Sequence, residues 1–284
     1  MSDYDIDFFF DPVCPFAWIT SRWVEKVAAQ RDYAVDWRFI PLRILNKDKD
    51  YATEFPPEYV HGHGAGLRML RVAAKVRAEL GRDQMFPLYT AYGQSIFDIE
   101  PERVDEQYAR LGSVEHSAEV LAAAGLPTEH ATAVDDDSWD AELEGEAEAA
   151  LTHTGREVGT PIIAFQPPTG PAFFGPVISR IPTDDEALGL WDAVIHLAEF
   201  PGFAEMKRSL RESPQLRALG WVPAPRWSNM TGKPAVEATP SHDAAVRTRS
   251  SDLAAGRTPP STHRARRGPG CSARARRCRS CRPS

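Results

Sequence analysis

The stretch Ile6-Asp-Phe-Phe-Phe-Asp-Pro-Val-Cys-Pro-Phe-Ala-Trp18 holds the main clue to the fold. Its first part, residues 6–10, is a short apolar run that ends at Asp11-Pro12. An apolar run of this length closed by a turn dipeptide is typical of a buried strand. Residues 6–10 are therefore predicted to form a strand that leads into a turn carrying Cys14.

A helix and a second strand are predicted to follow. Ile19, Trp23 and Val27 recur at spacings of three and four, which indicates a helix over residues 16–29. Pro15 fits the first turn of that helix, where its missing N–H costs nothing. Residues 34–40 alternate well enough for a strand. The first forty residues thus predict a strand–helix–strand unit with a cysteine at the start of the helix.

The rest of the body reads as helices followed by a hairpin. Residues 57–155 are mostly helical in pattern, while 161–165 and 172–174 are apolar strands joined by a turn-rich segment. A long helix is expected over 184–200, and another helical stretch after Pro201-Gly202. This order predicts an α/β, thioredoxin-like fold with an all-helical insertion at about 57–157.

Charge divides the 284-residue chain into two parts. Residues 229–284 contain 12 Lys and Arg but 3 Asp and Glu, whereas residues 1–228 contain 21 and 37. The C-terminal part has no aromatic residue and few large aliphatic ones, so it predicts a disordered basic tail beside a domain over 1–228. The acidic body argues against membrane or specific nucleic-acid binding, and the tail predicts at most non-specific contact with polyanions. Neither a membrane-spanning run nor a secretory signal is expected.

Cys14 is the candidate catalytic residue. The thiolate is the reactive form of cysteine, and a helix N-terminus stabilises it through the dipole and the free N–H groups. No basic residue lies within the seven positions before Cys14, so the helix end is expected to provide most of the activation. The other interpretation is a small buried apolar side chain, the usual role of a lone cysteine.

Gly159-Thr-Pro161 is the second notable feature, because a proline here starts an apolar strand. Such a proline suits either a cis peptide at a close approach or an ordinary trans residue at an edge strand. The sequence alone leaves both open.

Three segments contain clustered histidine, aspartate or cysteine residues of the kinds that bind metals, and none of the three is expected to hold a metal. His61 and His63 lack a third ligand and are expected to lie in a flexible segment. Asp135-Asp-Asp137 lacks the alternating ligands of a calcium loop and fits a solvated helix start. The C-terminal cysteines form a single close-spaced pair of candidate zinc ligands with one more distant cysteine, in an Arg-rich setting: Cys271, Cys278 and Cys281.

Several motifs together resemble a known family. Phe10-Asp-Pro-Val-Cys-Pro-Phe-Ala-Trp18 and Gly159-Thr-Pro161 are similar to the active-site turn and the cis-proline loop of DsbA-like thioredoxin-fold oxidoreductases. The mycothiol-dependent nitroreductases of actinobacteria are more similar still, over roughly residues 5–216. That similarity rests on segments 18–23, 87–91, 125–127, 159–162, 173–182 and 190–193.

The resemblance implies a cytoplasmic, homodimeric enzyme with Cys14 as the nucleophile. It implies no tightly bound cofactor; mycothiol or another low-molecular-weight thiol is the cosubstrate, and a disulfide or an electrophilic small molecule such as a nitro compound is the substrate. The residues expected to bind the thiol and substrate are those beside the cysteine and in the proline loop: Pro15, Phe16, Ala17, Trp18, Thr160 and Pro161. Of these, Pro161 would be the cis-proline, and Phe16 and Trp18 would shape the site.

The sequence departs from this family at Ala17, where many members carry a second cysteine. A dithiol cycle needs a resolving thiol, and residues 1–228 contain no cysteine besides Cys14. Monothiol chemistry therefore remains. Phe97-Asp98 also stand where family members often have a histidine. Two alternatives stay open: a thiol-dependent isomerase or transferase like the kappa-class glutathione transferases, and a thioredoxin-fold protein that only binds clients.

Overall fold

The computed structural model describes residues 3–207 and 212–221, which belong to one compact unit, Met1–Pro225. The centre of this unit is a four-stranded sheet in the order β2-β1-β3-β4. Its strands are β1 (Ile6–Phe10), β2 (Val35–Phe39), β3 (Ile162–Phe165) and β4 (Ala172–Phe174). β1 and β2 are parallel, whereas β3 is antiparallel to both β1 and β4. This is the predicted thioredoxin-like topology.

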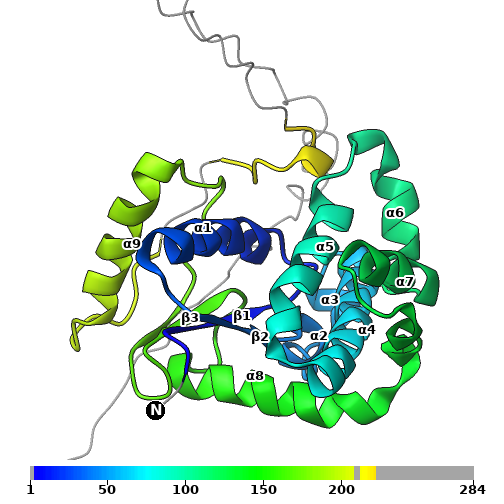
Figure 1. The fold of residues 1–284 in the computed structure, drawn as a ribbon, viewed down its shortest axis with the longest axis horizontal. Helices are drawn as coiled ribbons and strands as arrows, with labels where there is room; N and C mark the ends of the chain where they lie inside the picture. The colour runs from blue at the N-terminus through cyan, green and yellow to red at the C-terminus, as the bar shows by residue number, and fades with distance from the viewer. Residues whose placement is uncertain (1–2, 208–211, 222–284) are drawn as a thin grey trace, which may run out of the picture. The chain divides into compact units, whose positions relative to one another are not determined.

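Helices cover both faces of the sheet. In Figure 1, α1 (Pro15–Arg31) and α9 (Asp184–Ala198) lie on one face and α8 (Asp140–Thr154) lies on the other. β1 is therefore enclosed from above and below, and all five of its residues are buried. A strand covered on both faces is apolar without alternation, which explains the run of three phenylalanines.

The pattern predicted for α1 is confirmed. Ile19, Trp23 and Val27 are fully buried. Trp23 packs edge to face against Trp191 of α9, with the ring centroids 5.2 Å apart. The Trp23 indole N–H donates to the Ala187 carbonyl at 2.9 Å. These contacts hold the first and last helices of the fold together.

The segment between β2 and β3 is helical, as predicted, but its helices begin earlier than residue 57. They are α2 (Leu42–Leu45), α3 (Tyr51–Glu54), α4 (Pro57–Leu80), α5 (Met85–Phe97), α6 (Val104–Arg110), α7 (Val114–Ala123) and α8. Short 3-10 turns link or follow them: η1 (Arg82–Gln84), η2 (Pro101–Arg103), η3 (Thr128–Asp135), η4 (Asp137–Trp139) and η5 (Arg217–Leu219).

Two local predictions are wrong. His61 and His63 do not lie in a flexible segment, because both are inside α4, whose glycines allow close packing. Residues 203–207 after Pro201-Gly202 are not helical, and residues 208–211 are outside the described part of the chain. The predicted tail, 229–284, also lies outside it, so the domain boundary at 228 stays a prediction. Among the described residues, no helix has the length and apolar character needed to cross a bilayer.

A buried ion network fastens α8 and α4 to the sheet. The Arg38 guanidinium of β2 donates to Asp7 at 2.8 Å and holds both oxygens of Glu146 at 3.0 Å. Arg77 of α4 lies 3.3 Å from the same Glu146 carboxylate. Glu146 therefore pairs with two arginines whose side chains are at most 20% exposed.

Glu146→Ala is expected to destabilise the fold by about 3 kcal/mol, because it leaves two largely buried guanidinium groups short of a partner. Urea unfolding of the full-length protein measures the change. Glu144→Ala is the matched control on the same helix: its pair with Lys47 is exposed on both sides, so about 0–1 kcal/mol is expected. Equal losses for the two variants would contradict this role of Glu146.

His116 is a buried titratable group inside the helical insertion. Its side chain is 0% exposed, and its Nε2 lies 3.0 Å from the Ser95 hydroxyl. Burial, helped by the charge of Arg110, lowers the pKa of His116 to about 4. The folded protein thus holds this imidazole neutral at pH values where an unfolded chain binds a proton.

His116 therefore contributes a loss of stability as the pH drops from 6.5 towards 4. Across this window the unfolded His116 is protonated and the folded one is not, which amounts to about 3 kcal/mol. Between pH 6.5 and 4, urea unfolding should show that His116→Asn loses about 3 kcal/mol less stability than the wild type. His153→Asn, at an exposed site on α8, should keep the wild-type dependence. A His116→Asn profile parallel to the wild type would refute the assignment.

Candidate active site

Cys14 caps the N-terminus of α1, directly after the turn that ends β1. Its sulfur accepts the Ala17 N–H at 3.4 Å. The thiol also donates to the Thr160 carbonyl, with Sγ 3.4 Å from the oxygen. Cys14 is 8% exposed. The predicted nucleophile therefore lies at the edge of the core, between the start of a helix and the loop that enters β3.

The loop that faces the thiol is fixed to the sheet. The Thr160 hydroxyl donates to the Phe9 carbonyl at 3.2 Å, and the Pro161 carbonyl accepts the Gly175 N–H at 2.8 Å. The Thr160–Pro161 peptide bond is cis. Cys14, Ala17, Thr160 and Pro161, four of the residues expected in the site, are thus brought together.

The other predicted residues belong to the first turn of α1. Pro15 and Phe16 are half-buried beside the cysteine. Trp18 is 2% exposed and packs inward against α5, where a Cβ on Gly93 would come within 2.1 Å of the indole. The Trp18 ring is therefore part of the packing between α1 and α5 and does not lie at the surface.

The expected activation of the thiol by the helix end is wrong for the thiol in this structure. Burial raises the pKa of Cys14 to about 12. The N–H of Ala17 opposes this rise, and the charge of Asp11 adds to it. Burial outweighs the helix end here because the thiol is covered on almost every side.

Asp11 is a residue whose importance the sequence analysis missed. Its side chain is 0% exposed and accepts the N–H groups of Val13 at 3.0 Å and Leu42 at 2.7 Å. Burial raises its pKa to about 7, against the effect of those two hydrogen bonds. The available signal is a carboxylate between a buried strand and a cysteine turn, but the dipeptide Asp11-Pro12 indicates only a turn when it is read locally.

Four aromatic side chains form a second missed feature, the Tyr51 cluster: Tyr51, Phe55, Tyr59 and His63. The Tyr51 hydroxyl lies 3.0 Å from His63 Nδ1 and 3.5 Å from the Leu42 carbonyl. Burial and the charge of Arg43 lower the pKa of His63 to about 4. The cluster is connected to the cysteine turn through Leu42, whose N–H binds Asp11.

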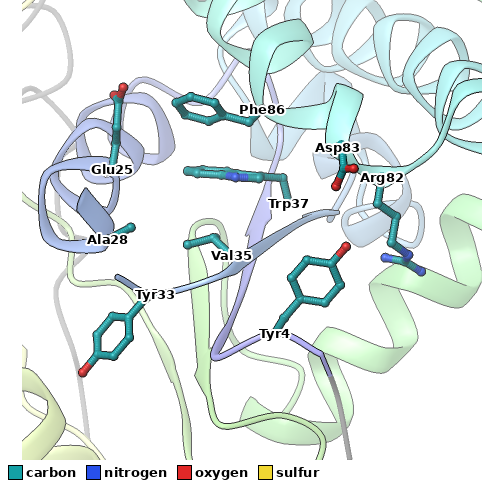
Figure 2. Close-up of a pocket in the computed structure, with 9 residues that line it drawn as sticks. All are labelled: Tyr4, Glu25, Ala28, Tyr33, Val35, Trp37, Arg82, Asp83 and Phe86. Atoms are coloured by element: carbon teal, nitrogen blue, oxygen red, sulfur yellow. The ribbon is translucent and has the colours of Figure 1, made fainter. Parts of the chain in front are cut away.

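A pocket of about 280 Å³ lies elsewhere, at the edge strand β2 (Figure 2). The Trp37 indole lies between Phe86 and Val35, and Glu25 and Asp83 lie on opposite sides in this view. None of the residues that line this pocket belongs to the predicted site. The candidate site is therefore defined by Cys14 and its contacts.

The predicted metal candidates do not come together in the described residues. Nowhere in 3–207 and 212–221 do three or more His, Cys, Asp or Glu side chains form a group that could hold a metal ion. His61 lies against the Tyr108 carbonyl at 2.7 Å, whereas His63 contacts Tyr51. Cys271, Cys278 and Cys281 lie outside the described part.

Comparisons with known proteins give one family. Residues 13–208 match the family described as Rv2466c-like, "Mycothiol-dependent nitroreductase Rv2466c". A curated relative, the uncharacterized protein Rv2286c of Mycobacterium tuberculosis, is 30% identical over 210 residues, which cover 72% of this chain and 81% of that protein. The crystal structure of a probable DsbA oxidoreductase, SCO1869 of Streptomyces coelicolor, matches with a TM-score of 0.44 and 14% identity. That match covers 73% of this chain and 94% of the other.

The family match begins one residue before Cys14 and continues past the Thr160–Pro161 loop and α9. It therefore includes Cys14 and the Thr160–Pro161 loop, but it begins after Asp11. The resemblance found in the sequence motifs is confirmed: the chain belongs to the Rv2466c-like family of mycothiol-dependent nitroreductases.

Proposed function

We propose that this protein is a thiol-dependent oxidoreductase in which Cys14 is the nucleophile and mycothiol is the cosubstrate. The observation that carries the proposal is the position of Cys14: the first-turn N–H of Ala17 reaches its sulfur, and its thiol faces the Thr160 carbonyl. The family of the chain supports mycothiol as the thiol. Mycothiol enters as a substrate, so no resident cofactor is needed.

The disulfide reaction needs one protein sulfur, one small disulfide and one small thiol. The Cys14 thiolate attacks one sulfur of a disulfide, the S–S bond breaks, and a thiolate leaves as the mixed disulfide forms. A second small thiolate then attacks that mixed disulfide, restores Cys14 and leaves as the new disulfide. Ala17 makes the second step intermolecular, because no neighbouring protein thiol stands at position 17.

A nitro compound would accept the same two electrons. Two thiols supply two electrons and two protons, so a nitro group becomes a nitroso group with loss of one water and formation of one disulfide. The incoming thiol would lie beside Thr160 and Pro161, with Pro15, Phe16 and Ala17 on the helix side and Trp18 supporting them from below. The Thr160 carbonyl would then exchange its contact with the Cys14 thiol for one with the bound substrate.

Adduct formation tests the proposal. The full-length protein is incubated separately with the disulfides of mycothiol and glutathione. It is then digested, and the mass of its Cys14 peptide is measured by mass spectrometry. A mycothiol adduct on Cys14 that free mycothiol removes is the expected result. Peptides with Cys271, Cys278 and Cys281 serve as references for unselective exchange. Absence of a Cys14 adduct with either disulfide, while the reference cysteines react, would overturn the proposal.

A second function is favoured by the raised pKa of Cys14. A thiol that stays protonated could donate a hydrogen bond to the thiolate of a bound cosubstrate, as an isomerase or transferase of the kappa-class type requires. No electron would then move. Cys14→Ser separates the cases: it abolishes the redox reaction, it can preserve an isomerase, and it leaves a purely client-binding protein unchanged.

Two properties of the working enzyme belong to the same proposal. We place it in the cytoplasm, where low-molecular-weight thiols are kept reduced and can serve as the electron donor. We also propose a homodimer, on the strength of the family resemblance alone. Size-exclusion chromatography with light scattering on the full-length protein tests the homodimer. A mass of 31.5 kDa would mean a monomer and contradict the proposed dimer.

A further inference from the structure

Asp11 connects the cysteine turn to the segment that follows β2. One carboxylate oxygen accepts the Val13 N–H at 3.0 Å, immediately before Cys14, and the other accepts the Leu42 N–H at 2.7 Å. The main-chain carbonyl of Asp11 also accepts the Cys14 N–H at 3.1 Å. The position of the thiol therefore depends on three hydrogen bonds to this one residue.

The carboxyl group is enclosed without a cation. It is 0% exposed, and a Cβ at Gly66 of α4 would come within 2.5 Å of Oδ1. Among the described residues, no Lys, Arg or His side chain forms an ion pair with it. Two backbone N–H groups are its only hydrogen-bond donors there. The ionised form is consequently costly, which fits its raised pKa of about 7.

The charge of Asp11 raises the pKa of three titratable groups on three other elements. They are Cys14 at the start of α1, Tyr51 of α3 and Tyr89 of α5, and burial raises the pKa of each. All three are therefore protonated at neutral pH. A negative charge on Asp11 makes ionisation of each of them harder still.

Arg43 and His63 are the groups next to Tyr51. Arg43 of α2 lies 4.3 Å from the Tyr51 ring. His63 of α4, hydrogen-bonded to Tyr51, is neutral above its pKa of about 4. Asp11 is thus the group of this set whose charge changes around pH 7.

We propose that Asp11 is a positioning residue for Cys14: its carboxyl group fixes the turn that carries the thiol and, once ionised, its charge opposes formation of the Cys14 thiolate. The inference rests on the proposed function only in taking Cys14 as the reactive group. The two groups then titrate as a coupled pair.

The coupling gives the reactivity of Cys14 a distinctive pH profile. Below pH 7 the logarithm of the rate should rise by one for each pH unit, because Asp11 is neutral and each unit increases the thiolate tenfold. Above pH 7, ionisation of Asp11 cancels that gain over as many pH units as its charge raises the pKa of Cys14, since every carboxylate formed makes its thiol a weaker acid. The profile should therefore flatten near pH 7. A purely structural Asp11 would give a straight line through this region.

Iodoacetamide labelling of the full-length protein from pH 5.5 to 9 tests this, with the Cys14 peptide quantified by mass spectrometry. Wild type should flatten near pH 7. Asp11→Asn keeps the size of the side chain and removes the charge, so its profile should continue straight and its rate at pH 8 should be about tenfold higher. Cys271, Cys278 and Cys281 report the reagent's own pH response in the same sample.

Asp7→Asn is the matched control, because Asp7 of β1 is also a buried carboxylate but pairs with Arg38. It should keep the flattened profile. A straight wild-type profile would overturn the proposal even if Asp11→Asn fails to fold. So would flattening that persists in a folded Asp11→Asn protein. A flattened profile without any mycothiol adduct would instead refute the proposed function and leave the role of Asp11 standing.

Discussion

Cys14→Ser should reduce mycothiol-dependent reduction by a factor on the order of 10³ or more, the scale seen when a catalytic nucleophile is removed. A serine hydroxyl forms no disulfide and ionises far less readily than a thiol. Its oxygen can still accept the Ala17 N–H, so the N-cap of α1 is retained and the fold should survive. The assay is consumption of a nitroaromatic compound or of a mixed disulfide by full-length protein with reduced mycothiol.

The control is a cysteine-to-serine change outside the proposed site. Cys271→Ser should retain full activity under the same conditions. Turnover by Cys14→Ser within a few-fold of wild type would refute Cys14 as the nucleophile. Thermal unfolding of both variants shows whether any loss comes from misfolding, since the serine protein is expected to melt within a few degrees of wild type.

Ala17→Cys should convert the monothiol site into a dithiol site. Ala17 is 0% exposed in the first turn of α1, and its N–H already lies 3.4 Å from the Cys14 sulfur. A thiol there attacks a mixed disulfide on Cys14 without having to diffuse to it. We expect release of the small thiol from Cys14 to become at least about a hundredfold faster, because the step is now intramolecular.

Intact mass after addition of the mycothiol disulfide measures the change. Wild type should accumulate a protein–mycothiol adduct. The Ala17→Cys protein should instead pass to a form two mass units lighter than its reduced state, with a disulfide between Cys14 and the thiol introduced at position 17. Ala17→Ser matches the added size without a thiol and should behave like wild type. A long-lived adduct on the Ala17→Cys protein would show that position 17 cannot reach the sulfur on Cys14.

The sequence predicted those parts of the molecule that depend on local pattern. Local pattern correctly predicts the strand β1 from its apolar run and the start of α1 from Pro15. It also predicts the buried face of α1 from the spacing of Ile19 and Trp23. The β3–β4 hairpin is predicted in the same way. In each case a residue's neighbours along the chain decide its structure, so periodicity is sufficient.

The electrostatics of the site could not be predicted in this way. The pKa of Cys14 is raised by burial, and that burial comes partly from Thr160, which lies 146 residues further along the chain. Asp11 is held by Leu42 and covered by Gly66, which belong to other elements. The sequence places a cysteine at a helix end, but the packing of distant segments determines whether its thiol is ionised.

The histidines of α4 illustrate the same limit. His61-Gly-His63-Gly suggests flexibility when read locally, because glycine favours many backbone conformations. In the folded chain these residues continue a 24-residue helix, where Gly62 lies against the Tyr108 side chain. Tertiary packing overrides the local preference, and it also brings His63 to Tyr51.

Rapid-quench mass spectrometry during turnover tests the role of Cys14 most directly. Full-length protein is mixed with reduced mycothiol and with a nitroaromatic compound or a mixed disulfide as the substrate. The reaction is stopped at intervals, and the mass of the Cys14 peptide is measured at each time point. We predict a Cys14–mycothiol mixed disulfide that forms and decays at least as fast as the enzyme turns over. Steady turnover without that species, or with an adduct that decays more slowly than product forms, would contradict the monothiol mechanism.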